Sequence, residues 1–158
     1  KKIEDALQNI NTFRQQEGKA LQTDMLDRIG NILDLLEEVG SFEADRLNRI
    51  REKLHSNLDA AIEKDKIDEN RFEQELIYYL EKIDITEEKV RLHNHCKFFR
   101  EVADEGEPVG KKLSFIAQEI GREINTIGSK ANHSDIQRLV VLMKDELEKI
   151  KEQLMNVL

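Results

Sequence analysis

An apolar seam runs along the first part of the chain, with its members separated by three or four positions. This spacing fits the 3.6-residue turn of an α-helix and not the two-residue alternation of a half-buried strand. Proline, the strongest helix breaker, occurs once in 158 residues. The seam, interrupted by the charge of Glu17, consists of Ile3, Leu7, Ile10, Phe13, Leu21, Met25, Ile29, Ile32, Leu36 and Val39. It predicts a long amphipathic helix, and a seam of this kind also favours pairing between chains.

The first helix is expected to end at Gly40 in a left-handed cap, with Ser41 capping a second helix over about 42–64. A short connection between two such helices predicts an antiparallel pair. A polar turn at 65–69 then leads into a third apolar stripe that ends near Ile83.

A break at Asp84 is favoured over a helix that continues to Ala103, because Asp84 and Glu87 have the spacing of a capping box. Residues 104–110 form the clearest loop, with two glycines and the proline. A helix over 111–130 follows.

Ser134 and Gln137 predict a second capping box and a final helix. The fold class is therefore all-α, a bundle of long antiparallel helical hairpins. We divide it into a hairpin or coiled-coil-like region at 1–83 and a motif-bearing region at 84–158.

The net charge of −8 argues against a general nucleic-acid binder, but the charge is unevenly placed. Residues 1–85 hold 13 Lys/Arg against 20 Asp/Glu, whereas residues 86–130 hold 8 against 8. The lone Cys96 excludes an intrachain disulfide, which suits a cytoplasmic location. No apolar run approaches the roughly 18 residues of a membrane span.

The helix expected at 111–130 has three distinct faces. A buried face is predicted for Leu113, Ile116, Ala117, Ile120, Ile124 and Ile127, an opposite face for Gln118, Arg122, Asn125 and Ser129, and a border stripe for Glu119, Glu123, Thr126 and Lys130. Carboxylates at such a border are partly desolvated, so their affinity for a cation rises. A solvated face with ordinary Glu–Lys pairs is the alternative. The Asn, Thr, Gly and Ser residues clustered between 121 and 129 weigh against it, because they are mediocre helix formers.

The stretch from Thr86 to Phe99 carries a second polar group. His93 and His95 lie about 200° apart on a helix and cannot hold one ion together. Glu88 and His95 do share a face, with Arg91 between them, and could meet one ligand or metal. A hydrogen-bonded structural histidine is the alternative, and Cys96 is expected to be a packed thiol.

Four blocks of sequence resemble the YicC/YloC-type endoribonuclease family. They are VGKKLSFIAQEIGREINTIGSKA (109–131), DITEEKVRLHNH (84–95), FRQQEG (13–18) and ELEKIKEQLMNV (146–157). The resemblance implies the C-terminal half of a longer bacterial protein, a metal-dependent endoribonuclease that forms homo-oligomers. Gly121 and Asn94 depart from the family pattern, where Asn and Ser are expected. The matching polar residues are Glu75, Glu87, Glu88, Arg91, His95, Gln118, Glu119, Arg122, Glu123, Asn125, Thr126, Ser129 and Lys130.

On this resemblance, three carboxylates are the candidate ligands of Mg²⁺ or Mn²⁺, namely Glu88, Glu119 and Glu123. His95, Glu119 and Glu123 are the candidate catalytic residues, with His95 moving a proton. If His95 acts without metal, the 2′-hydroxyl of RNA is the nucleophile. The candidate RNA-binding residues are Arg91, Arg122, Asn125, Thr126, Ser129 and Lys130. The rival hypothesis is a helical oligomerisation or interaction module without catalytic activity.

Overall fold

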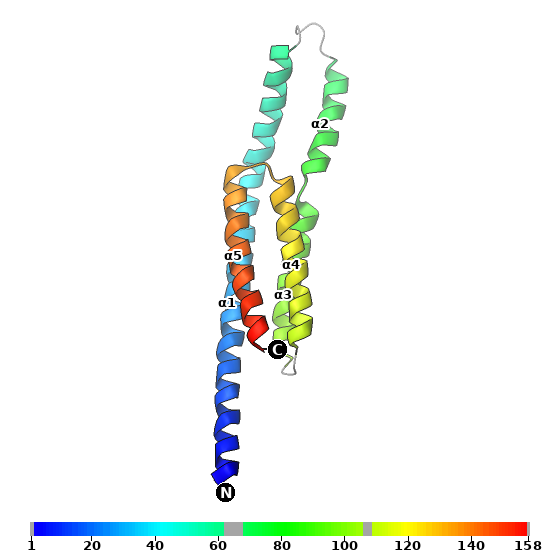
Figure 1. Ribbon diagram of the computed structural model, residues 1–158. Coiled ribbons are helices and arrows are strands. Elements are labelled where there is room, and N and C mark those ends of the chain that lie inside the picture. Colours follow the sequence, from blue (N-terminus) through cyan, green and yellow to red (C-terminus); the bar gives the residue numbers. More distant parts are fainter. Residues whose placement is uncertain (1, 62–67, 106–108, 158) are drawn as a thin grey trace.

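A computed structural model describes residues 2–61, 68–105 and 109–157. These residues form five α-helices and no strands: α1 (Lys2–Ala61), α2 (Glu69–Ile83), α3 (Thr86–Ala103), α4 (Gly110–Lys130) and α5 (Ser134–Val157) (Figure 1). The all-α fold is confirmed, as is the break between α2 and α3 at Asp84. Part of the turn predicted at 65–69 and part of the loop at 104–110 lie outside the described residues.

The predicted break at Gly40 is wrong, because α1 is one helix of 60 residues. Ser41 does not cap a new helix; its hydroxyl donates to the carbonyl of Glu38, 2.7 Å away, within the same helix. The buried face of α1 continues past this point through Phe42, which contacts the ring of His133, and Arg46, which is 1% exposed. Because the residues after Gly40 continue the same buried face, the chain stays helical through this glycine.

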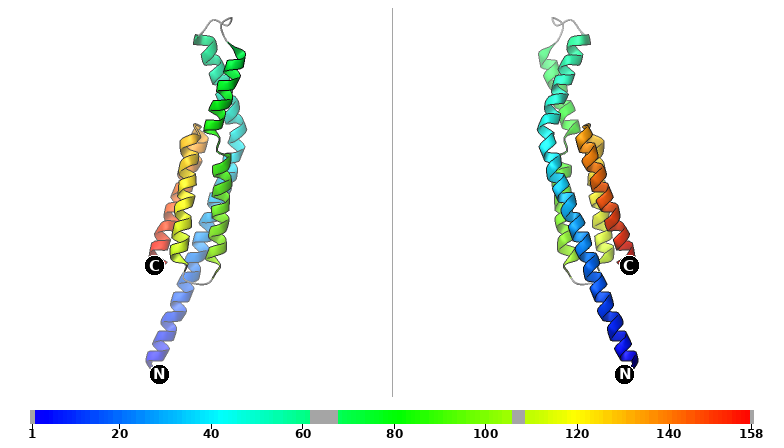
Figure 2. Two further views of the ribbon diagram at one scale, coloured as in Figure 1. Left: turned by 90° about the vertical axis from the view of Figure 1, so that its right-hand side faces the viewer. Right: turned by 90° about the vertical axis from the view of Figure 1, so that its left-hand side faces the viewer.

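Four helices pack around one hydrophobic core (Figures 1 and 2). The middle of α1 lies against α3 and α5, and α4 lies between these two on the far side of the bundle. Apolar stripes from all four helices meet inside, with Ile29 and Ile32 of α1 and Ile120 and Ile124 of α4 fully buried. The core of the described residues therefore combines α1 with α3, α4 and α5.

The two ends of α1 extend beyond this bundle (Figure 2). The C-terminal end lies beside α2, where His55 meets Phe72 with ring centroids 4.7 Å apart. Asp68 caps α2 by accepting from the backbone N–H groups of Asn70 and Arg71. The N-terminal end projects from the opposite side of the bundle, with its apolar seam exposed.

Two glycines allow α4 and α5 to approach closely. A methyl group added at Gly121 would lie 3.1 Å from the side chain of Leu147, and one at Gly128 would lie 3.0 Å from Val140. The two glycines are seven residues apart on α4, and the residues that they contact are seven residues apart on α5. The two pairs are therefore successive contacts of one antiparallel helix interface. These glycines therefore have a packing role, in a stretch whose composition was taken as a sign of function.

The turn between α4 and α5 is held by Gln137, but not through the predicted capping box. Its side-chain amide donates to the carbonyl oxygens of Gly128 and Ala131, the latter at 2.8 Å. These carbonyls belong to the last turn of α4 and the residue after it, where a helix leaves acceptors without intrahelical partners. Gln137 thus closes the end of α4 from the first turn of α5.

Candidate functional site

The candidate site lies along the interface of α3 and α4, which we call the α3–α4 seam. The three faces predicted for α4 are confirmed: its apolar face is buried, Gln118, Arg122, Asn125 and Ser129 are exposed, and the border residues are buried or half-buried. On α3, Glu88 is 5% exposed and His95 is half-buried, whereas Arg91 is exposed. Polar groups from both helices therefore border a common hydrophobic interface.

An ion pair closes one end of the seam. Lys130 Nζ donates to Glu88 Oε1 at 2.7 Å and to the backbone carbonyl of Asp84 at 3.2 Å. The second oxygen of Glu88, Oε2, is buried without a hydrogen-bond partner in the described part of the chain. A buried carboxylate with one free oxygen retains strong affinity for a donor or a cation.

The pairing of Glu88 with Lys130 sets the register of the two antiparallel helices. Seven residues further along α3 lies His95, and seven residues back along α4 lies Glu123. Both steps cover two helical turns, so His95 and Glu123 occupy about the same level of the seam, roughly 10 Å from the ion pair. Glu119 lies one turn beyond Glu123, further from Glu88.

Glu123 is buried, with 5% of its surface exposed. It makes no side-chain hydrogen bond or ion pair with any other described residue. Glu119, one turn away, is half-buried and pairs with the exposed Arg122 at 3.3 Å. In the part of the chain that the structure describes, no group of three or more His, Cys, Asp or Glu side chains is arranged to hold a metal ion. At most two such ligands are thus brought together here.

The remaining predicted RNA-binding residues point in different directions. Arg91 is exposed and pairs with Glu87 on its own helix. Thr126 donates to the carbonyl of Arg122 at 3.1 Å and Ser129 to that of Thr126 at 3.0 Å, while Asn125 is exposed. Lys130 alone of these residues reaches across to α3.

Arg46, which was not among the predicted site residues, supports the α3–α4 seam from α1. Its Nη2 donates to the carbonyl oxygens of Ile83, at the end of α2, and Lys130, at the end of α4, the latter at 3.4 Å. Burial lowers the pKa of Arg46, and its Nε has no hydrogen-bond partner within residues 2–61, 68–105 and 109–157. The signal was present, because Arg46 lies seven residues after Val39 and so occupies a position of the apolar seam.

Asp84 organises the corner where α2 meets α3. Its Oδ1 accepts from the hydroxyl of Thr86 at 2.7 Å and from the backbone N–H of Thr86 at 2.9 Å. These hydrogen bonds, the hydroxyl first, lower the pKa of Asp84. The predicted capping box is wrong: the N-cap of α3 is Ile85, which makes no side-chain capping hydrogen bond, and Glu87 pairs with Arg91.

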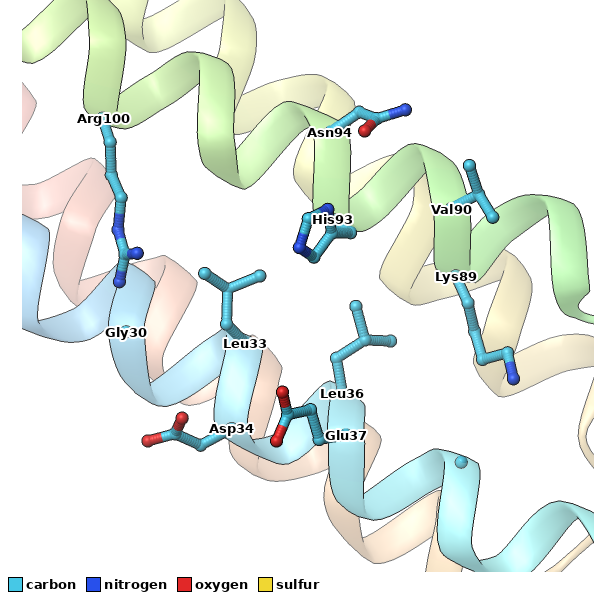
Figure 3. Close-up of a pocket in the computed structure, with 11 residues that line it drawn as sticks. Gly30, Leu33, Asp34, Leu36, Glu37, Lys89, Val90, His93, Asn94 and Arg100 are labelled. Atoms are coloured by element: carbon cyan, nitrogen blue, oxygen red, sulfur yellow. The ribbon is translucent and has the colours of Figure 1, made fainter.

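A separate pocket of about 560 Å³ lies between α1 and α3 (Figure 3). His93 points into it toward Leu33 and Leu36 of α1, whereas His95 belongs to the seam. The two histidines therefore serve different sides of α3, as their spacing predicted. The charged residues that line this pocket come from both helices and are Asp34, Glu37, Lys89 and Arg100.

Two other buried groups take no part in the seam. Cys96 is fully buried, which confirms a packed thiol, and burial raises its pKa to about 12. His133, in the turn before α5, is 7% exposed, and neither ring nitrogen has a hydrogen-bond partner among the residues that the structure describes. The sequence analysis did not single out His133, because a lone histidine in a turn carries no pattern.

No described helix is both long and apolar enough to cross a membrane. Residues 39–158 match the family described as "Endoribonuclease YicC-like, C-terminal". The chain is 38% identical over 156 residues to a "Probable endoribonuclease YicC" of Clostridioides difficile (strain 630), covering 98% of this chain and 53% of the relative. It is 33% identical over 155 residues to a protein of the same name from Haemophilus influenzae, again covering 98% and 53%. The chain thus spans about half the length of these curated relatives, and it belongs to the YicC-like endoribonuclease family, of which it contains the C-terminal region.

Proposed function

We propose that this chain forms the C-terminal part of a metal-dependent endoribonuclease and that the α3–α4 seam contributes to RNA cleavage. The observation that carries the proposal is the pair of buried carboxylates, Glu88 and Glu123, on a seam flanked by cations. Among the described residues, Glu88 Oε2 is buried without a hydrogen-bond partner, and Glu123 makes no side-chain hydrogen bond or ion pair. Burying the free oxygen of Glu88 is costly unless a ligand compensates. The two relatives named as probable endoribonucleases support RNA as the substrate.

The donor set suits Mg²⁺ or Mn²⁺. Mg²⁺ is commonly held by only one or two carboxylates, with water and substrate phosphate completing its coordination. Glu119 and Glu123, one turn apart on α4, would supply these carboxylates, and Glu88 is too far along the seam to join them. When bound, such an ion would polarise a scissile phosphate or activate water.

His95 is proposed to transfer a proton at the level of Glu123. Its half-buried ring is accessible from solvent, and the two ring nitrogens of an imidazole can donate and accept a proton. Arg122 and Arg91 are exposed and would contact RNA phosphates. Lys130 is engaged with Glu88, so we assign it to positioning that carboxylate first and to phosphate contact second.

The test is cleavage of a structured RNA by the full-length protein, with Mg²⁺, with Mn²⁺ and with a chelator. Glu119→Gln/Glu123→Gln keeps side-chain volume while removing the charges, and we expect it to abolish cleavage with unchanged helicity. Glu148→Gln/Glu152→Gln is the matched control, an exposed pair with the same spacing on α5. Full activity in the seam variant contradicts the role of these carboxylates.

The second candidate function is self-association, supported by the exposed end of α1. Ile3, Leu7, Ile10 and Phe13 are 77%, 57%, 54% and 60% exposed, respectively. An apolar stripe on a projecting helix suits pairing with another helix. Sedimentation of wild type and Leu7→Ser/Ile10→Ser tests this: we expect the substitutions to shift an oligomer toward monomer, and an unchanged mass contradicts it.

A further inference from the structure

The outward face of α4 carries a polar stripe of unusual composition. Six exposed residues follow one another at steps of four and three, over roughly 27 Å of helix: Lys111, Phe115, Gln118, Arg122, Asn125 and Ser129. The stripe contains no acidic residue, although the chain has a net charge of −8. We call these six residues the α4 outer stripe.

Phe115 is the unexpected member of the stripe. Its side chain is 63% exposed, while the apolar face of α4 is already complete and buried without it. An exposed ring between cations and amides provides a flat surface for stacking a nucleic-acid base. Lys111, one turn before it, and Arg122, two turns after it, supply charge for the phosphates on either side.

We propose that the α4 outer stripe binds single-stranded RNA, with one base stacked on Phe115. The proposal rests on the proposed function and adds the substrate class. Gln118 and Asn125 carry amide groups that donate to and accept from base edges. Arg122 is 71% exposed and only loosely paired with Glu119 at 3.3 Å, so exchanging this contact for a phosphate costs little.

Single-stranded RNA fits this surface better than duplex RNA does. The major groove of an A-form duplex is deep and narrow, whereas unpaired bases are free to stack on an aromatic ring. A protein partner fits less well, because a single apolar side chain offers little of the desolvated centre that a stable protein interface needs. The stripe also adjoins Glu119, so RNA bound there passes beside the proposed carboxylates.

The test uses the 158-residue chain, a fluorescein-labelled U12 RNA and the same strand annealed to A12, in chelator so that binding is measured without cleavage. We expect Phe115→Ala to weaken U12 binding about 5- to 150-fold, the range for loss of one stacked base. Arg122→Gln should reduce the slope of log K against log salt by about 0.7. The duplex should bind more weakly than U12.

Phe115→Trp supplies a direct signature, because the chain has no other tryptophan. It should restore U12 affinity, and its fluorescence should be quenched on binding. Tyr78→Trp is the matched control, with an aromatic side chain that is also 63% exposed but lies on α2, and its fluorescence should not respond.

Two results overturn this inference: equal affinity of Phe115→Ala and wild type for U12, or equal binding of duplex and single strand. If Phe115→Ala changes only the sedimenting mass, the stripe is a contact between copies of the chain. The proposed function fails separately, when the full-length protein binds RNA but does not cut it with either metal.

Discussion

Lys130 and Glu88 form a 2.7 Å ion pair that joins the C-terminal end of α4 to the first turn of α3. The carboxylate is almost fully buried, while the lysine is one-third exposed. Arg46 holds the backbone carbonyl of the same lysine from α1. One residue at the end of α4 therefore ties three helices together where the proposed site begins.

Lys130→Met tests how strongly this pair stabilises the fold. The substitution leaves Glu88 buried without the one side-chain partner that it has among the described residues. We expect the free energy of unfolding to fall by about 2 to 3 kcal/mol, since a buried charge that loses its partner is more costly than a lost surface pair. Urea unfolding followed by circular dichroism measures the change.

The control is Lys149→Met, which breaks an exposed pair with Asp145 on α5 and should lower the free energy of unfolding much less. Adding Glu88→Gln to Lys130→Met should recover part of the loss, because the uncompensated charge is removed. A cost for Lys130→Met no larger than that of the control would show that Glu88 is solvated.

The faces of α4 could be predicted from sequence because each depends only on helical periodicity. The buried Ile120 and Ile124, the exposed Arg122 and the bordering Glu123 all lie where 100° per residue puts them. The course of α1 could not be predicted in the same way. Gly40 is compatible with a helix end or a helix interior, and only the packing of the residues after it decides between them.

Gly40→Ala distinguishes the continuous helix from a hairpin. A methyl group at Gly40 meets nothing within 4 Å, and the backbone there is helical. We expect the unfolding free energy to rise by about 0.5 to 1 kcal/mol, as for glycine to alanine in a helix interior. Gly18→Ala, also without close neighbours in α1, should give a similar gain. If Gly40 ended a helix in the left-handed conformation, alanine would destabilise the protein.

The contacts between helices could not be predicted from the sequence either, because they also depend on how the helices pack. The position of Arg46 on the apolar seam indicates that it is buried, but its partners could not be predicted, since they are backbone carbonyls that carry no sequence signal. Gly121 and Gly128 lie in a stretch whose composition favoured a functional role, but in the structure they pack against Leu147 and Val140. Periodicity indicates which face of a helix is buried, but not which atoms it meets.

Gly128→Ala tests the close approach of α4 and α5. The added methyl would lie 3.0 Å from Val140 Cγ1, and Val140 is 3% exposed and β-branched, so it has little freedom to turn away. We expect a net loss of about 1 to 2 kcal/mol, because overpacking exceeds the gain in helix propensity. Combining it with Val140→Ala should cost less than the sum of the two single variants, and strict additivity would show that the two residues do not touch.

The pH dependence of stability should carry a contribution from Asp84. Its pKa is lowered in the folded protein, chiefly by the hydroxyl of Thr86, while in the unfolded chain it has the ordinary value of about 3.9. The unfolded chain therefore binds the proton more readily, so this contribution is present above pH 4 and is lost as the pH falls through the folded-state pKa. Urea unfolding from pH 7 to pH 2.5 should show Asp84→Asn less stable than wild type at neutral pH, with the difference in unfolding free energy closing at low pH.

Thr86→Val removes the hydroxyl donor but keeps the backbone N–H, so a carbon-detected NMR titration should show the pKa of Asp84 rising toward its ordinary value. A gap that persists at pH 2.5, or an unmoved titration in Thr86→Val, would mean that other groups hold the corner between α2 and α3.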